Sequence, residues 1–133
     1  MREIKFRGRV KNTNKPQWVY GIVIPPQYSS WEDWTLFDGE RRWIVDTETV
    51  GQYTGIMDSE ENEIYEGDII SLPYRRRTET GVVYYVNGCY LVKNKVFLHD
   101  DKLDSVVFFK EIHVIGNIHD NPDLFKDGEK HGT

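Results

Sequence analysis

Three consecutive arginines form the densest run of positive charge in the sequence. Arg75, Arg76 and Arg77 follow Tyr74 directly, and two more tyrosines stand on the next expected strand. Guanidinium groups bind phosphate oxygens and aromatic rings stack on bases, so these residue types together are typical of a surface that holds a nucleic-acid strand. The same run also suits a charged loop that only keeps the protein in solution. The sequence leaves both alternatives open.

A second group consists of large aromatic side chains in a stretch without clear periodicity. Tyr28, Trp31, Trp34 and Phe37 lie between a Pro-Pro pair and an Asp-Gly pair. Exposed aromatic clusters mark protein interfaces, where Trp and Tyr often dominate the binding energy. The spacing of Trp31 and Trp34 suits one face of a helical turn, and an irregular excursion is an equal alternative. The cluster is equally compatible with covering the core and with forming an interface. These four residues are the main candidates for an interaction surface.

His-Asp pairs and a single cysteine are the residues that come nearest to catalytic or metal-binding groups. His99 with Asp100, and His119 with Asp120, carry groups that can bind zinc or manganese, but each pair follows an expected strand. Whether the pairs meet in space does not follow from the sequence. Cys89 lacks the flanking pattern of a nucleophile. We expect no catalytic site, no metal and no cofactor, and an enzyme or small-ligand binder remains the alternative.

Composition narrows the class of protein. The 133 residues are enough for one domain or for two small lobes. The net charge of −5 argues against a generally basic nucleic-acid binder, although a local basic patch is compatible with it. A single cysteine permits no internal disulfide, and no apolar run has the length of a membrane span. The sequence therefore predicts a soluble, cytoplasmic protein with no membrane partner.

Short strands separated by turn residues occupy most of the chain. The Asn87-Gly88 pair, between strand-forming residues on both sides, is the strongest hairpin signal. A helical turn is expected to begin at Pro122. This pattern, with little helix, predicts a mainly β fold of short antiparallel strands. The expected strands cover residues 4–7, 18–24, 41–46, 69–72, 81–86, 89–92, 106–109 and 112–118, with a charged loop at 74–80. A further hairpin is expected at 56–65, with a solvated loop at 58–63 as its tip.

The stretch from Glu48 to Ile70 is the most distinctive part of the sequence. It contains T-V-G-Q-Y-T-G-I and E-I-Y-E-G-D-I-I, while R-E-I-K-F-R-G lies near the N-terminus and V-I-G-N-I-H-D-N-P-D-L near the C-terminus. In this order, these blocks resemble the YopX family over nearly the whole chain. The resemblance implies a mainly β protein of phage or prophage origin, inside the host cell. The family has no established biochemical function, so the resemblance assigns neither an activity nor catalytic residues to this chain.

These observations lead to one expected organisation and one expected function. A single YopX-like domain covers residues 1–125, with an N-terminal hairpin lobe at about 1–47 and a small SH3-like barrel at about 48–125, before a disordered tail at 126–133. We expect a non-enzymatic module that binds a host or phage protein, or that assembles with itself. Binding of nucleic acid through residues 74–77 is the alternative.

Overall fold

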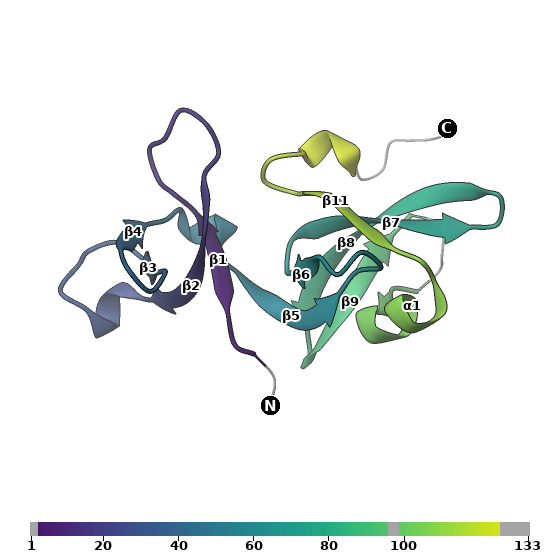
Figure 1. The fold of residues 1–133 in the computed structure, drawn as a ribbon, viewed down its shortest axis with the longest axis horizontal. Helices are drawn as coiled ribbons and strands as arrows, with labels where there is room; N and C mark the ends of the chain where they lie inside the picture. Colours follow the sequence, from purple (N-terminus) through teal and green to yellow (C-terminus); the bar gives the residue numbers. More distant parts are fainter. Residues whose placement is uncertain (1–2, 96–98, 126–133) are drawn as a thin grey trace. The chain divides into compact units, whose positions relative to one another are not determined.

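The computed structural model describes residues 3–95 and 99–125, and the tail expected at 126–133 lies outside them. Figure 1 shows strands throughout this part of the chain, with little helix. The chain divides into two compact units, Met1–Gly55 and Ile56–Thr133. The prediction of a mainly β fold is confirmed. None of the described helices is both long and apolar enough to span a bilayer.

The first unit is built on antiparallel strands that pair in the order β4-β3-β2-β1-β5. The hairpin expected near the N-terminus is formed by β1 and β2, whose register pairs Phe6 with Gly21 and Arg9 with Trp18. No helix covers residues 29–34, so the helical alternative for the tryptophan segment is wrong. The elements are β1 (Phe6–Arg9), β2 (Trp18–Ile24), the 3-10 helix η1 (Pro26–Tyr28), β3 (Thr35–Phe37), β4 (Arg42–Ile44), the 3-10 helix η2 (Thr47–Thr49) and β5 (Gly51–Met57).

The second unit contains a five-stranded antiparallel sheet in the order β10-β9-β8-β7-β11. The strand β5 continues into this unit and has β6 as its neighbour, so the hairpin expected around residues 56–65 is present. Among the described strands the five-stranded sheet is open, and the SH3-like barrel is not confirmed. The strands are β6 (Glu63–Tyr65), β7 (Asp68–Tyr74), β8 (Arg77–Val86), β9 (Cys89–Asn94), β10 (Asp101–Lys102) and β11 (His113–Asn117).

Turn chemistry fixes the hairpin between β8 and β9. Asn87 and Gly88 both have positive φ angles, 51° and 85°, as the two central residues of a type I′ turn require. Val86 then pairs with Cys89, so the loop contains only these two residues. The prediction of a hairpin at this pair is confirmed.

One expected strand is a helix instead. Residues 103–109 form α1 (Leu103–Phe109), whereas the β-branched and aromatic residues at 106–109 predict a strand. Leu103 and Val106 are three residues apart and have exposed fractions of 0% and 4%, so one helical face enters the core. Burial of this face outweighs the local strand preference.

The core of the second unit lies between the sheet, α1 and the chain just before β11. Eight buried residues, from these elements and from β6, form one cluster. The turn expected at Pro122 is also present, as the 3-10 helix η3 (Pro122–Leu124). The members of the cluster are Ile64, Ile70, Leu72, Val83, Val92, Leu103, Val106 and Ile112.

Candidate interaction surface

Three side chains form a row across one face of the first unit's sheet. Ile22 on β2 is the partner of Phe37 on β3, and Phe37 is the partner of Arg42 on β4. Directly opposite residues of paired strands project to the same side of a sheet. Ile22 has an exposed fraction of 54% and Phe37 of 43%. We call Ile22, Phe37 and Arg42, together with Trp31, which stacks on Arg42, the outer row.

The opposite face of the same three strands is the core face. On this face Leu36 of β3 is the partner of Val23 on β2 and of Trp43 on β4. Each of the three is adjacent in sequence to a residue of the outer row. Leu36 is fully buried, and Val23 and Trp43 pack against the cluster to which it belongs. Because side chains alternate along a strand, the residues that hold this unit together are not those of the outer row.

Arg42 is held in place by two contacts from its own unit. Its Nε donates a hydrogen bond to Thr35 Oγ1 at 2.9 Å, and its guanidinium lies 4.7 Å from the centre of the Trp31 ring. Its Nη2 is buried and donates to no acceptor in the described part of the chain. No carboxylate of residues 3–95 or 99–125 forms an ion pair with it. The outer row therefore carries a positioned positive charge that the described chain does not neutralise.

The turn between β3 and β4 keeps the two strands in register. The carboxylate of Asp38 accepts hydrogen bonds from the backbone N–H groups of Glu40 and Arg41 and from Trp43 Nε1, at 2.8–2.9 Å. These bonds, led by that from Arg41, lower the pKa of Asp38 to about 2. An ionised Asp38 thus fixes the turn that sets Phe37 opposite Arg42.

The aromatic residues expected to form one surface are divided between two environments. Trp31 has an exposed fraction of 39% and Tyr28, on η1, of 76%, while Phe37 belongs to the outer row. Trp34 packs instead against the buried cluster of the first unit. Trp31 and Trp34 therefore lie in different environments. Trp34 covers the core, whereas Trp31 is exposed.

Sequence reasoning missed Ile22 and Arg42 as members of the surface. Residues 18–24 are nearly all apolar, so their pattern does not show which of them face outward. Only the pairing of β2 with β3 and of β3 with β4 places the two residues beside Phe37.

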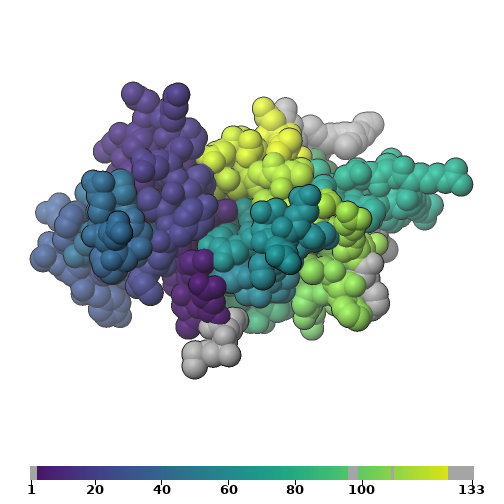
Figure 2. All heavy atoms as spheres, in the orientation of Figure 1, coloured from purple at the N-terminus to yellow at the C-terminus, as the bar shows by residue number. Residues whose placement is uncertain are grey.

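The arginine run lies at the tip of the hairpin between β7 and β8. Tyr74 pairs with Arg77, so Arg75 and Arg76 alone form the turn and the loop expected at 74–80 is wrong. The Arg75 guanidinium lies 5.2 Å from the centre of the Tyr74 ring, and Arg77 Nε is 2.6 Å from Glu79 Oε2. The tip projects from the rest of the second unit (Figure 2), and these arginines with Tyr74 line an open depression.

The His-Asp pairs contribute to local structure. Asp100 accepts a 2.6 Å hydrogen bond from the hydroxyl of Tyr84, which raises the pKa of that phenol. The backbone N–H groups of His119 and Asp120 donate to Asn117 Oδ1 and close the turn after β11. No group of three or more His, Cys, Asp or Glu side chains in the described ranges has the arrangement of a metal site.

Cys89 lines a small cavity in the second unit. The cavity has a volume of about 220 Å³ and no histidine among its described lining residues. The Sγ atom of Cys89 lies 3.6 Å from the carbonyl oxygen of Val86, across the turn. This environment does not supply the base that a nucleophilic thiol needs. The lining residues are Ile56, Cys89, Tyr90, Lys102, Leu103 and Asp104.

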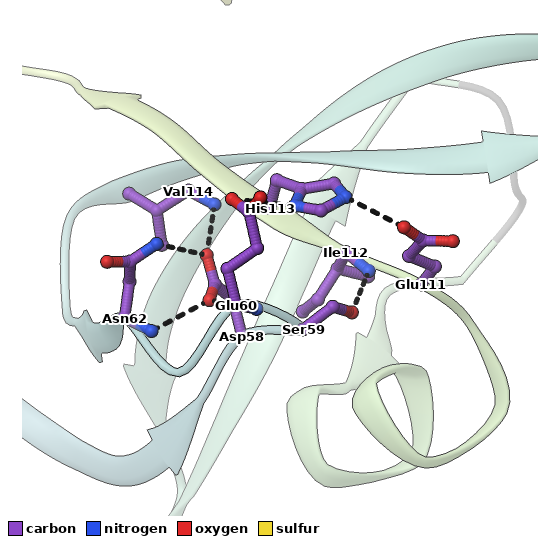
Figure 3. A network of polar contacts seen from close by, with 8 residues as sticks. All are labelled: Asp58, Ser59, Glu60, Asn62, Glu111, Ile112, His113 and Val114. Carbon is purple, nitrogen blue, oxygen red and sulfur yellow. Dashed lines mark hydrogen bonds and ion pairs between the residues drawn. The ribbon is translucent and has the colours of Figure 1, made fainter.

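The loop between β5 and β6 contains a buried carboxylate where a solvated loop was expected. Asp58 has an exposed fraction of only 5%. Its Oδ1 accepts hydrogen bonds from the backbone N–H groups of Glu60 and Asn62, and its Oδ2 accepts one from Val114 N at 2.9 Å (Figure 3). The prediction is wrong for Asp58, because a polar loop can be buried when its carboxylate meets enough donors.

These bonds set the ionisation of Asp58. Burial by itself raises the pKa of the carboxyl, but the N–H groups of Val114, Asn62 and Glu60 and the Asn62 amide outweigh it. The net result is a pKa below the ordinary value, so the carboxylate is charged at neutral pH.

Two further contacts join this loop to β11. Ser59 Oγ accepts a hydrogen bond from Ile112 N at 2.9 Å, and Ser59 N donates to the Ile112 carbonyl at 3.0 Å. His113 lies between Glu60 and Glu111, with Nδ1 3.4 Å from Glu60 Oε1 and Nε2 3.2 Å from Glu111 Oε2 (Figure 3). Since the two ring nitrogens meet different carboxylates, these groups do not converge on one ligand position.

Comparison with known proteins identifies the family. The family model described as YopX protein matches residues 5–126, so the chain belongs to the YopX family. Its fold is similar to that in the crystal structure of protein EF1440 from Enterococcus faecalis, with a TM-score of 0.57, 20% identity, and coverage of 95% of this chain and 100% of that chain. No curated protein matches the sequence. At this identity, the structural similarity concerns the fold alone.

Proposed function

We propose that the protein is a non-enzymatic interaction module that binds another protein through the outer row. The observation that carries this proposal is the exposure of Ile22 and Phe37 beside the stacked pair of Arg42 and Trp31, on the face opposite the buried apolar cluster of the unit. Aromatic residues and arginine are enriched at the centres of protein interfaces, where lysine and acidic residues are depleted.

The setting we infer for this function is the cytoplasm of a host cell that carries the phage or prophage. The sequence blocks typical of the YopX family support this origin. A single cysteine, Cys89, suits a reducing compartment because the chain needs no internal disulfide.

The proposal can be tested by capturing partners of the tagged full chain from host cells. The double variant Ile22→Ala/Phe37→Ala removes the apolar part of the outer row. The matched control is Met57→Ala/Phe108→Ala, which removes one unbranched apolar and one aromatic side chain with exposed fractions of 47% and 79%. We expect a stoichiometric partner with the wild type and the control, but not with the outer-row variant. A partner retained equally by all three proteins would reject the proposal.

A second candidate function is nucleic-acid binding by the tip of the β7–β8 hairpin. The observation that favours it is the position of Arg75 and Arg76 as the two turn residues, beside an aromatic ring. We expect single-stranded DNA to bind with an affinity that falls steeply as the salt concentration rises. The double variant Arg75→Ala/Arg76→Ala should abolish this binding, whereas Lys102→Ala should not. Binding that is unchanged at high salt would contradict this function.

A further inference from the structure

We propose that the partner of the outer row is an acidic, apolar protein segment that places a carboxylate on Arg42 and apolar side chains on Ile22 and Phe37. This inference rests on the proposed function and adds the chemistry of the partner.

The guanidinium of Arg42 has the properties of a carboxylate receptor. A guanidinium has five N–H donors in one plane, and one of them is used by Thr35 Oγ1. Stacking on Trp31 covers a face of the group, while its N–H bonds lie in the plane and remain directed sideways. Nη2 is buried and donates to no acceptor in the described residues, so a partner meets the rest of the guanidinium and not this nitrogen. A carboxylate supplies the charge that no described residue supplies to Arg42.

The other residues of the row determine what surrounds that carboxylate. Ile22 and Phe37 are cross-strand neighbours with exposed fractions of 54% and 43%, so they form one continuous apolar surface beside Arg42. Covering this surface with apolar side chains removes it from water. Excluding water around Arg42 also strengthens the bond between its guanidinium and the carboxylate.

A second copy of the chain does not satisfy this site by symmetry. None of the residues Ile22, Trp31, Phe37 and Arg42 is acidic, so two outer rows placed face to face bring two guanidinium groups together without a carboxylate. Like charges opposed across an interface are unfavourable. The outer row of a second copy is therefore not the occupant that fits.

Nucleic acid fits the outer row less well than protein. Strong binding to a nucleic-acid strand needs several phosphate contacts, and the row offers Arg42 as its single cation. Trp31 already stacks on Arg42, which leaves Phe37 as the one ring of the row that could stack on a base. The small number of cations therefore favours a protein segment.

The inference can be tested with peptides selected on the full chain. A display library of random 12-residue peptides is the probe, and the strongest binders are synthesised with a fluorescent label for anisotropy titration. We expect the binders to share Asp or Glu beside aromatic or aliphatic residues. Replacing that acid by its amide should weaken binding about 10- to 100-fold, the range for hydrogen bonds to charged groups.

A double-mutant cycle connects the peptide's acid to Arg42. Arg42→Gln keeps an N–H donor for Thr35 Oγ1 but removes the charge, and thermal unfolding verifies that the variant is folded. We expect Arg42→Gln to weaken the acidic peptide as much as the amide replacement does, with little further loss when both changes are combined. Two fully additive losses would overturn the assignment of the carboxylate to Arg42.

The remaining outcomes separate this inference from the proposed function. Binders without an acid that still lose affinity with Ile22→Ala/Phe37→Ala would overturn the inference and leave the proposed function in place. Failure to select any peptide, or binders that are indifferent to that double variant, would overturn both. Self-association in sedimentation, or binding of an oligonucleotide, would identify another occupant if Ile22→Ala/Phe37→Ala abolished it.

Discussion

The two units of this protein use their sheets in different ways. In the second unit, one cluster of eight buried residues joins the sheet to α1. In the first unit, the buried cluster has only Val19, Leu36 and Val45, and the other face of β2 and β3 leaves Ile22 and Phe37 exposed. The second unit therefore has the larger buried cluster, whereas the first leaves an apolar surface exposed.

The two units also differ in net charge. Residues 1–55 contain eight basic and seven acidic residues, a net charge of +1, while residues 56–133 contain nine basic and fifteen acidic residues, a net charge of −6. The acidity of the whole chain is thus a property of the second unit alone. An acidic partner of the outer row meets a unit whose charges nearly balance, so the overall charge of −5 does not argue against it.

Core substitutions should have the largest effects and show whether the units unfold separately. Ile70→Ala in the second unit and Leu36→Ala in the first each remove a fully buried side chain, so we expect each to lower the free energy of unfolding by about 2–5 kcal/mol. All four tryptophans, Trp18, Trp31, Trp34 and Trp43, belong to the first unit, and their fluorescence therefore follows that unit.

In urea titrations, we expect Leu36→Ala to shift the fluorescence transition and Ile70→Ala to shift mainly the far-UV circular dichroism. The two probes should then separate in the variants. Coincident transitions that move together in both variants would show that the units unfold as one. The two units would then differ in their surfaces only.

The next largest effect is expected at the buried carboxylate of the second unit. Asp58→Asn leaves one acceptor oxygen where two now receive N–H groups from Glu60, Asn62 and Val114, so we expect a loss of about 1–3 kcal/mol at neutral pH. Glu61→Gln, an exposed change in the same loop, should have little effect.

The loss at Asp58 should also depend on pH. The folded-state pKa of Asp58 lies below its unfolded value of roughly 3.9, so its stabilisation is present above that pH and disappears as the pH falls through the folded-state pKa. Melting temperatures measured from pH 7 to pH 2 should therefore converge for wild type and Asp58→Asn at the acid end. A constant difference over the whole range would contradict this explanation.

A comparable effect is expected at Gly21 of β2, which lies against the backbone of Phe37 on β3. A Cβ atom added at Gly21 would lie 2.1 Å from the carbonyl oxygen of Phe37, so Gly21→Ala must separate the two strands. We expect a loss of about 1–3 kcal/mol, as for other overpacking changes, together with weaker partner binding because Ile22 and Phe37 lose their alignment. An unchanged melting temperature would mean that β2 and β3 can separate at little cost in free energy, so that the outer row is not rigid.

The smallest effects on stability are expected in the outer row itself. Ile22→Ala and Phe37→Ala remove exposed atoms, so each should change the free energy of unfolding by no more than about 0.5 kcal/mol while partner binding is lost. Leu36→Ala, next to Phe37 on the core face, supplies the contrast in the same titrations. A loss above about 1.5 kcal/mol for Phe37→Ala would place this residue with the core and not with a surface.

Much of the fold follows from local signals in the sequence. The Asn87-Gly88 turn and Pro122 are local, because their backbone preferences act within two or three residues. The prediction was wrong for the strand at 106–109, since burial of Leu103 and Val106 depends on distant parts of the core. It was also wrong for Asp58, whose donors include Val114, far along the chain.

The candidate surface could be predicted only in part for the same reason. Trp31 and Phe37 attract attention by residue type, but Trp34 has the same type and packs on the core. What separates them is the side of the sheet on which each lies, and this depends on the register of β2, β3 and β4. No short turn sets the register of β2 against β3, because residues 25–34 separate the two strands.

The contact between the β5–β6 loop and β11 has a consequence for biosynthesis. Asp58 and Ser59 receive hydrogen bonds from residues 56 and 53 positions further along the chain, at Val114 and Ile112. A nascent chain leaves the ribosome N-terminus first, so these donors emerge long after the loop that needs them. The strand pairs of the first unit are complete by residue 55. This unit can therefore fold before the last strand of the second unit has been synthesised. The proposed binding surface can thus form before the part of the chain that carries most of the buried core.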